Sequence, residues 1–201
     1  MQAFHDVSIV IVSPGPHPYL ERCVRSCVAQ TYPGRSYEIL ILHDGKSLTV
    51  EDVIANYGKR REVASHLTEM TPAAILTTVL RNTTGRFLVF VDPDDFISDY
   101  MILFQTVFLY DNAGCGGVSV DRWLVEADTD RKIAREAAQE KPLLAGTMFR
   151  KDLLVKLTRS EGVQLGYDPA RLREILARNS AVGHLPVAFY RKSVLRAPAS
   201  G

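Results

Sequence analysis

The sequence predicts an α/β domain in which helices cover both faces of a mostly parallel sheet. In the first half of the chain, short runs of aliphatic and β-branched residues alternate with amphipathic helical patterns, and Gly, Pro or Asp residues separate them. This alternation is typical of strand–helix–strand units, in which parallel strands need a crossover helix. With 201 residues, 46% of them hydrophobic, the chain is long enough for one domain with a substantial core.

The elements of the first half are predicted from periodicity and capping residues. We expect strands at residues 7–12, 37–42, 62–67 and 87–91. We expect amphipathic helices from Leu20 to the Pro33-Gly34 stop, from Val50 to Tyr57, from Pro72 towards Gly85, and after Asp99. Thr49, Thr71 and Asp99 are the predicted N-caps. The stripe expected to be buried in the last of these helices is Met101, Phe104, Val107 and Phe108.

The pattern changes after the Gly-rich segment 114–117. Three further strands are expected, at residues 118–125, 143–149 and 182–190. Residues 126–140 are charged and Ala-rich, which predicts a loop or a loose helix. A short helix is expected over 151–157, and Asp168-Pro169 is expected to open the last one. The final Ala-Pro-Ala-Ser-Gly segment, residues 197–201, is interpreted as a frayed tail.

The charges of the chain are balanced overall but unevenly distributed. The 24 Lys and Arg residues against 23 Asp and Glu give a formal net charge of +1, so nucleic acid is not an expected partner. From Arg150 to the end, however, ten basic and four acidic residues give a surplus of six positive charges. An anionic ligand held between an acidic and a basic part is one interpretation, and solvated surface charge is the other.

Cellular location is predicted from what the sequence does not contain. The apolar stretch near the amino terminus, residues 7–12, is too short for a signal peptide or a membrane-spanning helix, and no later stretch reaches spanning length. The three cysteines form neither a disulfide framework nor a zinc-site pattern. We therefore expect a cytoplasmic protein without a transmembrane segment.

Ligands of open parallel sheets bind beyond the carboxyl ends of the strands. That rule selects three loops, at residues 13–18, 43–47 and 92–95. In the last of them, Asp92-Pro93-Asp94-Asp95 brings three acidic groups together, and a hard divalent cation would neutralise their repulsion. A helix-entry turn rich in capping aspartates is the alternative. Asp44, at the end of a neighbouring strand, favours a ligand site.

Four segments, taken in order, resemble one known family. They are SIVIVSPGPHPYLERCV (8–24), SCVAQTY (26–32), EILILHDG (38–45) and GRFLVFVDPDD (85–95). This set is similar to the family 2 glycosyltransferases of GT-A fold. GTMFRK (146–151), and HLP (184–186) with Tyr190-Arg191, resemble that family's later strand and closing strand. The resemblance thus covers most of the chain and is most specific up to Asp95.

The resemblance implies a transferase that moves a sugar from a nucleotide diphosphate donor to an acceptor hydroxyl, usually with inversion and with Mn²⁺ or Mg²⁺. By position, Asp44 would accept a hydrogen bond from the base, Asp92 would hold the ribose, and Asp94 of the DXD motif would bind the metal. Ser13, which opens the first loop, is grouped with Asp44 and Asp92 as donor-binding, and Asp95 is expected to orient the turn. A single domain would then have a nucleotide-sugar-binding half (1–115), an acceptor half (116–190) and a tail (191–201).

The acceptor side is less defined by the resemblance. An inverting reaction needs a general base, and Asp168 and Glu174 are the candidates. Asp168 is equally explained as a helix cap, and Glu174 as a solvated or ion-paired residue. His184, before the closing strand, is a candidate metal ligand or phosphate contact, with a structural role as the alternative.

Several departures from the family pattern support a second interpretation. His43 and Lys46 replace two residues of the D-D-G-S motif, and Leu76 and Thr77 stand where an Arg-Asn pair is usual. The alternative is therefore a catalytically inactive GT-A-like domain that acts as a carbohydrate-binding or structural module. For the active enzyme, the acceptor would be a carbohydrate or another hydroxyl compound. The short chain leaves a homo-oligomer or larger assembly open, with part of the acceptor site contributed by another subunit.

Overall fold

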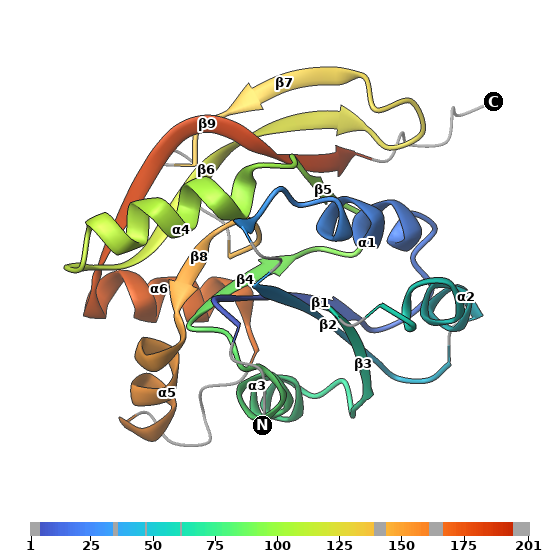
Figure 1. The fold of residues 1–201 in the computed structure, drawn as a ribbon, viewed down its shortest axis with the longest axis horizontal. Helices are drawn as coiled ribbons and strands as arrows, with labels where there is room; N and C mark the ends of the chain where they lie inside the picture. The colour runs from blue at the N-terminus through green and yellow to red at the C-terminus, as the bar shows by residue number, and fades with distance from the viewer. Residues whose placement is uncertain are drawn as a thin grey trace.

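A computed structural model of the chain describes residues 5–33, 36–46, 48–60, 62–138, 144–160 and 167–194. The described residues form one nine-stranded sheet with helices on both of its faces (Figure 1). The strand order is β3-β2-β1-β4-β8-β6-β9-β5, and β7 pairs with β6 outside this path. The predicted α/β class is therefore confirmed, with a sheet that is mixed rather than purely parallel.

The elements have the following bounds. The strands are β1 (Val7–Ser13), β2 (Tyr37–His43), β3 (Val63–Leu67), β4 (Phe87–Val91), β5 (Phe96–Ile97), β6 (Cys115–Glu126), β7 (Lys132–Glu136), β8 (Met148–Arg150) and β9 (Ala181–Val194). The helices are α1 (Leu20–Val28), α2 (Leu48–Tyr57), α3 (Pro72–Asn82), α4 (Met101–Asp111), α5 (Lys151–Ser160) and α6 (Pro169–Asn179).

The parallel half of the sheet consists of β3, β2, β1 and β4, with β1 between β2 and β4. Alternate residues of β1 enter two separate cores: Val7, Ile9 and Ile11 pack with α1, α2 and α4, whereas Val10 and Val12 pack with α3, α5 and α6. Figure 1 shows α1 and α4 above these strands and α3 and α5 below them. Burial on both faces explains why these strands are continuously apolar in sequence.

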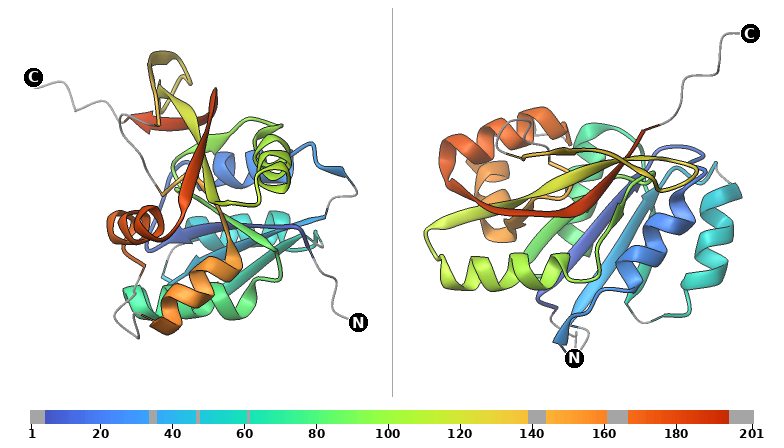
Figure 2. Two further views of the ribbon diagram at one scale, coloured as in Figure 1. Left: turned by 90° about the vertical axis from the view of Figure 1, so that its left-hand side faces the viewer. Right: turned by 90° about the horizontal axis from the view of Figure 1, so that it is seen from above.

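Most strand pairs that involve β5 to β9 are antiparallel. β8 runs antiparallel to both β4 and β6, and β5 runs antiparallel to β9. The long strands β6 and β9 pair in parallel, and both views of Figure 2 show them side by side and inclined to β1. This arrangement brings the carboxyl end of β9 to the loop that follows β4.

Most of the predicted elements agree with the structure. β4 covers residues 87–91 as predicted, and Thr71 caps α3, because its Oγ1 accepts a hydrogen bond of 3.3 Å from Ala74 N. The prediction for α2 was wrong at its start. That helix begins at Leu48, so Thr49 lies inside it and is not its N-cap.

The predicted face of α4 was wrong for Phe104 and Val107, which are exposed, whereas Met101 is buried as predicted and Phe108 packs partly buried against the core. Its N-cap is Tyr100 rather than Asp99, and no side chain caps it. Its buried residues are Met101, Ile102, Gln105, Thr106 and Leu109. Eight of its eleven residues are apolar or aromatic, and two of the polar ones, Gln105 and Thr106, are buried, so the spacing does not select the correct face. The choice comes from tertiary contacts, because Gln105 Nε2 donates to the carbonyl oxygens of Val118 at 3.3 Å and Gly146 at 2.8 Å.

Three predictions for the second half need correction. The segment expected to be a loop or loose helix contains β7, which forms an antiparallel hairpin with β6; residues 139–140 lie outside the described residues. Residues 191–194, expected in the tail, continue β9, and 195–201 are not described. In the strand predicted over 143–149, only 148–149 belong to β8; Ala145 forms a single bridge to Phe90, and residue 143 is not described.

Within the described ranges, none of the helices combines the length and the apolar character needed to cross a membrane.

The orientation of α4 can be tested with two aliphatic residues on opposite faces. Ile102 is 0% exposed and Val107 is 50% exposed. We expect Ile102→Ala to lower the free energy of unfolding by about 2–5 kcal/mol, because it leaves a cavity, and Val107→Ala to change it by less than about 0.5 kcal/mol. Urea denaturation measures both. If Val107→Ala lowers the free energy of unfolding more than Ile102→Ala does, the helix buries the face that was predicted from the sequence.

Candidate functional site

The carboxyl ends of β1, β2 and β4 meet at one edge of the sheet. Ser13 at the end of β1 is in register with His43 at the end of β2, and Ile11 is in register with Val91 at the end of β4. Asp44 and Asp92 directly follow β2 and β4. Since one strand separates these two, their ends lie about 10 Å apart. A ligand longer than a single phosphate is needed to reach both.

Asp92 is exposed at this edge. Desolvation by the surrounding protein raises the pKa of its carboxyl, the charge of Lys192 opposes this shift, and the charge of Asp94 adds to it. Its backbone N–H donates to Tyr190 Oη at 3.1 Å. A carboxylate that is accessible yet poorly hydrated is stabilised by any cation or hydrogen-bond donor that approaches it.

Asp94 has one engaged and one unengaged carboxylate oxygen. Oδ2 lies 2.9 Å from Nδ1 of His17, which comes from the loop after β1. Oδ1 is inaccessible to solvent and has no hydrogen-bond partner among the described residues. A buried carboxylate oxygen without a partner is unfavourable, so this atom is the natural point for a ligand to bind.

Asp95 has a different role from the other two aspartates of the turn. It is 4% exposed, accepts a hydrogen bond of 2.8 Å from Tyr190 Oη on Oδ2, and accepts one of 2.7 Å from Ser193 N on Oδ1. Burial raises its pKa to about 7. Asp95 therefore ties the turn to β9, as expected for a residue that orients the loop.

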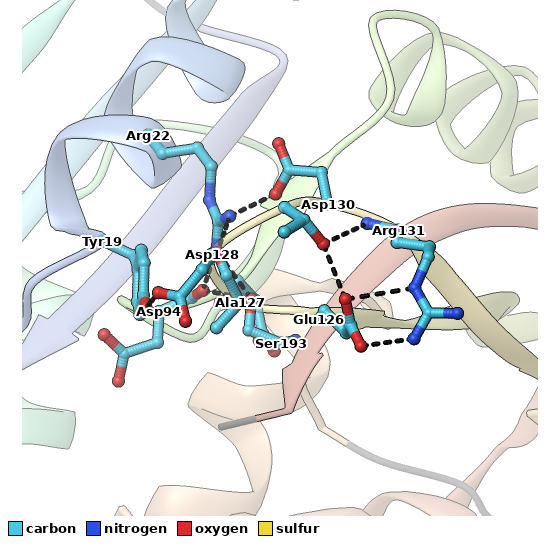
Figure 3. A network of polar contacts seen from close by, with 11 residues as sticks. Tyr19, Arg22, Asp94, Glu126, Ala127, Asp128, Asp130, Arg131 and Ser193 are labelled. Carbon is cyan, nitrogen blue, oxygen red and sulfur yellow. Dashed lines mark hydrogen bonds and ion pairs between the residues drawn. The ribbon is translucent and has the colours of Figure 1, made fainter. Parts of the chain in front are cut away.

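Arg22 of α1 holds the peptide that carries Asp94 (Figure 3). Its Nη2 donates to Asp94 O at 3.0 Å and to Ser193 Oγ at 2.8 Å, and Ser193 Oγ donates to the same carbonyl at 2.6 Å. Two donors thus converge on one backbone oxygen, which restricts where the Asp94 side chain can lie.

The other contacts of Arg22 fix the guanidinium itself. Nη1 donates to Ala127 O at 2.7 Å and forms an ion pair with Asp130, both in the turn between β6 and β7. The guanidinium carbon lies 4.6 Å from the ring centroid of Tyr19 and 4.7 Å from that of Phe96. These contacts connect α1, β5 and the β6–β7 turn to the aspartate loop.

A hollow of about 550 Å³ adjoins Asp44 at the same sheet edge. It is lined by Asp44, Lys46, Leu67, Thr68, Glu69, Met70 and Thr71. Asp44 Oδ1 accepts a hydrogen bond of 3.0 Å from Lys46 N, across Gly45 with its positive φ of 73°. Its other oxygen has no hydrogen bond to the described residues, so this carboxylate can accept one from a ligand in the hollow.

Ser13 and His43, at the ends of β1 and β2, differ in whether their polar atoms already have hydrogen-bond partners. Ser13 is buried, and its Oγ donates to Gly15 O at 3.2 Å, so its hydroxyl serves its own loop. Nδ1 of His43 is inaccessible to solvent and has no hydrogen-bond partner within the described ranges. His43, noted in the sequence only as a departure from D-D-G-S, thus has an unengaged polar atom beside Asp44.

The two candidate bases, Asp168 and Glu174, lie at different distances from the aspartate loop. Asp168 caps α6 through Oδ1, which accepts from Ala170 N at 3.0 Å and Arg171 N at 3.1 Å. The ring of the preceding Tyr167 lies 5.2 Å from that of Phe90 in β4, so the start of α6 lies beside the site. Burial raises the pKa of Tyr167, and the Asp92 charge adds to the effect.

Glu174 and His184 lie away from the aspartates. Glu174 is exposed one and a half turns further along α6 and forms an ion pair with Arg178. His184 uses both ring nitrogens elsewhere: Nε2 lies 3.1 Å from Asp121 Oδ1, and Nδ1 lies 3.2 Å from Ser119 Oγ. It stands nine residues before Ser193 on β9, a strand path of about 30 Å. The structure therefore does not bring His184 to Asp94.

Sequence reasoning missed four residues that position the aspartates. His17 lies in a loop that the strand-end rule had selected, so its presence there could have been weighed. Tyr190 was noted only as part of the closing strand, and Arg22 and Ser193 gave no signal, because the contacts of all three with the turn span between 72 and 99 residues of sequence.

The donor set limits what kind of metal site these residues can form. Nowhere in the described part of the chain do three metal-ligating side chains gather into one cluster. Asp94 offers one unengaged oxygen, and Asp92 offers an accessible carboxylate. Such a set fits a hard divalent ion that completes its coordination with ligand phosphates and water, as Mg²⁺ commonly does, and does not fit a cage made by protein alone.

Comparison with known proteins identifies the family. The model described as glycosyl transferase family 2 matches residues 8–196. The chain belongs to glycosyl transferase family 2. It is 28% identical over 109 residues to an uncharacterized glycosyltransferase of Haemophilus influenzae, and 28% identical over 101 residues to a poly(ribitol-phosphate) beta-glucosyltransferase of Bacillus spizizenii. These matches cover 53% and 48% of this chain but only 43% and 16% of the relatives.

Solved structures establish the GT-A fold of this family 2 chain. S. aureus TarS 1–349 in complex with UDP-GlcNAc superposes with a TM-score of 0.73 at 14% identity, covering 97% of this chain and 60% of that one. The mannosyltransferase PcManGT from Pyrobaculum calidifontis, in complex with GDP-Man and Mn²⁺, gives 0.69 at 16% identity, covering 98% and 59%. The fold predicted from the motifs is thereby confirmed.

Arg22 can be tested against a neighbour on the same helix. The Arg22 side chain is 13% exposed and that of Arg25 is 64% exposed. We expect Arg22→Met to lower the free energy of unfolding by about 2–4 kcal/mol, because it leaves buried oxygens without donors. Arg25→Met should change it by less than about 0.5 kcal/mol. Urea denaturation measures both variants, and equal losses would contradict a specific role for Arg22.

Asp95 should make stability depend on pH. Its folded-state pKa of about 7 lies above the ~3.9 of an unfolded chain, so between these values the folded state binds the proton more tightly. The free energy of unfolding should therefore fall as pH rises through this window, by about 2 kcal/mol between pH 5 and pH 7.

The variant Asp95→Asn isolates this effect. Because all other titrating groups are shared, the wild type should lose about 2 kcal/mol more than Asp95→Asn between pH 5 and pH 7 in urea denaturation. Asp99→Asn, an exposed change in the same loop region, is the control and should follow the wild type. Parallel profiles of the wild type and Asp95→Asn would refute the assignment.

Proposed function

We propose that this domain transfers a sugar from a nucleoside diphosphate donor to a hydroxyl acceptor such as a carbohydrate, with inversion at the anomeric carbon. The observation that carries the proposal is the position of Asp44, Asp92 and Asp94 at one edge of the sheet, where Asp44 lines a hollow of about 550 Å³. Neighbours of the same fold that were solved with UDP-GlcNAc or GDP-Man support the choice of ligand. Membership of the family supports the reaction class.

The positions of the carboxylates suggest how the donor binds. Asp44 borders the hollow and would accept a hydrogen bond from the base there. Asp92, about 10 Å away across β1, would accept from the ribose hydroxyls. Ser13 lies between them on β1, where its hydroxyl keeps the loop in shape through its hydrogen bond to Gly15 O.

Asp94 is the residue that would hold a divalent ion. Mn²⁺ or Mg²⁺ there would neutralise the diphosphate and the charge that develops on it as it leaves. His17 and the two donors on Asp94 O keep the carboxylate in place and leave Oδ1 without a protein hydrogen bond among the described residues. The Mn²⁺ in the complex of PcManGT supports a divalent ion in this fold.

Asp168 is the better placed of the two candidate bases. Its capping bonds both use Oδ1, and no hydrogen bond from the described residues reaches Oδ2. Oδ2 would accept the proton of the acceptor hydroxyl as that oxygen attacks the anomeric carbon. The bond from this carbon to the diphosphate oxygen breaks, and the diphosphate leaves with the electron pair. Glu174 is the second candidate, at a greater distance along α6 and already paired with Arg178.

Nucleotide binding and turnover test the proposal together. We expect UDP or GDP with Mn²⁺ to raise the melting temperature, because a ligand that binds only the folded state stabilises it. Asp94→Asn should remove the Mn²⁺-dependent part of the shift. Asp111→Asn, an exposed carboxylate at the end of α4, is the matched control and should keep it. A screen of nucleotide sugars for donor hydrolysis then identifies the donor.

Two outcomes would count against the proposal. If no nucleoside diphosphate shifts the melting temperature with or without metal, the domain is better explained as an inactive binding or structural module. If Asp94→Asn and Asp111→Asn behave alike, the metal does not bind at Asp94.

A further inference from the structure

A second hollow, strongly basic, lies at the other edge of the sheet. It has a volume of about 500 Å³ and is lined by Gly85, Arg86, Arg150, Lys151, Asp152, Val155, Lys156 and Arg159. We call it the basic hollow. Five of these residues are cations and one is a carboxylate. Four of these cations are among the ten basic residues counted from Arg150 to the end of the chain. None of the four lines the hollow beside Asp44.

The basic hollow is separate from the aspartate loop. Gly85 and Arg86 precede the first residue of β4, whereas Asp92 follows its last. The five residues of β4 span about 17 Å. The cations of the basic hollow therefore do not face the aspartates across a shared ligand, although Lys192 on β9 lies close enough for its charge to act on Asp92. The basic hollow needs its own explanation.

Two of the five cations have structural partners. Arg150 donates through Nε to Cys115 O at 2.8 Å and through Nη2 to the carbonyls of Leu109 and Asn112 at the end of α4. Lys151 Nζ donates to Thr83 O at the end of α3. Both side chains thus neutralise the negative ends of helices, although their positive charge still borders the hollow.

The other three cations have little compensation. Arg86 and Arg159 are exposed, and neither forms an ion pair with a carboxylate within the described ranges. Lys156 lies 3.9 Å from Asp152, but both side chains are more than 70% exposed, so this pair is weak. Lys156 and Arg159 are three residues apart on α5 and repel one another. A concave site with this charge excess favours an anion.

Arg86 is held in a defined position without a carboxylate. Its guanidinium carbon lies 5.6 Å from the ring centroid of Phe87 and 5.1 Å from that of Tyr110. Contact with two rings restricts the side chain while leaving its N–H groups available. The planar fork of such an Arg suits two oxygens of one phosphate.

We propose that the basic hollow binds a phosphate group of an anionic ligand that is distinct from the sugar donor. The hollow is larger than one phosphate, so the phosphate would enter with part of the molecule to which it is esterified. Arg86 and Arg159 would bind the phosphate oxygens, and Lys156 would add charge at the rim. The same chemistry can come from a soluble phosphate ester or from a phospholipid headgroup.

Binding experiments at low ionic strength can test the site and identify the source. Inorganic phosphate and glycerol 1-phosphate are titrated by calorimetry into the wild type, the double variant Arg86→Gln/Arg159→Gln and the double variant Arg171→Gln/Arg178→Gln. The last removes the same charge from exposed positions on α6 outside the hollow. Vesicles of phosphatidylglycerol, compared with phosphatidylcholine, form the second arm in a co-sedimentation assay.

We expect Arg86→Gln/Arg159→Gln to weaken phosphate binding about tenfold, and the α6 variant to bind like the wild type. Binding of soluble phosphates alone, or of phosphatidylglycerol vesicles alone, supports the site and names its source, provided that the hollow variant loses it. Asp94→Asn should retain this binding, so the result does not depend on the donor site.

The proposal is overturned if neither phosphates nor phosphatidylglycerol vesicles bind. It is also overturned if both double variants lose affinity equally, because the attraction would then be a general effect of net charge. Should the hollow double variant fold poorly, Arg159→Gln alone, on the exposed face of α5, gives the same comparison against Arg171→Gln.

Discussion

The hydrogen bonds that Asp95 receives from Tyr190 and Ser193 hold the loop on which the candidate donor site depends. Three acidic residues in one turn repel each other, and burial of Asp95 against β9 raises its pKa to about 7, so that this carboxyl carries less negative charge near neutral pH. With Asp95 committed to the protein, Asp92 and Asp94 remain for a ligand. The long strand β9 therefore contributes to the site although none of its residues is proposed to touch the donor.

The same turn is held from the opposite side by Arg22. Its guanidinium connects α1, the β6–β7 turn and β9 to the Asp94 carbonyl, so four distant segments meet at one peptide. Such rigid support matters for a metal ion that is bound partly by the protein and partly by a diphosphate. The protein carboxylate must then be held in place before the diphosphate binds. His43 and Lys46, which depart from the family pattern, take no part in these contacts of Arg22.

Acidic and basic groups lie at opposite ends of strand β4. The carboxyl ends of the parallel strands carry the aspartates, and the amino end of β4, together with α5, carries the basic hollow. One interpretation of the positive surplus in the sequence placed it opposite the acidic part, but the sheet places Arg150, Lys151, Lys156 and Arg159 at the amino end of β4. Lys192 on β9, which belongs to the same surplus, lies close enough to the aspartate loop for its charge to act on Asp92.

The sequence by itself determined the parallel strands, the helices between them and the loops that carry Asp44, Asp92 and Asp94, because these follow from local periodicity, caps and strand ends. It could not determine the buried face of α4, where apolar residues surround the helix, or the hairpin of β7, whose charged residues read as a loop. Only the tertiary structure decided that Asp95 is buried, that His17, Arg22 and Ser193 position Asp94, and that His184 lies elsewhere. Those outcomes depend on contacts between segments up to 171 residues apart, and no local pattern encodes them.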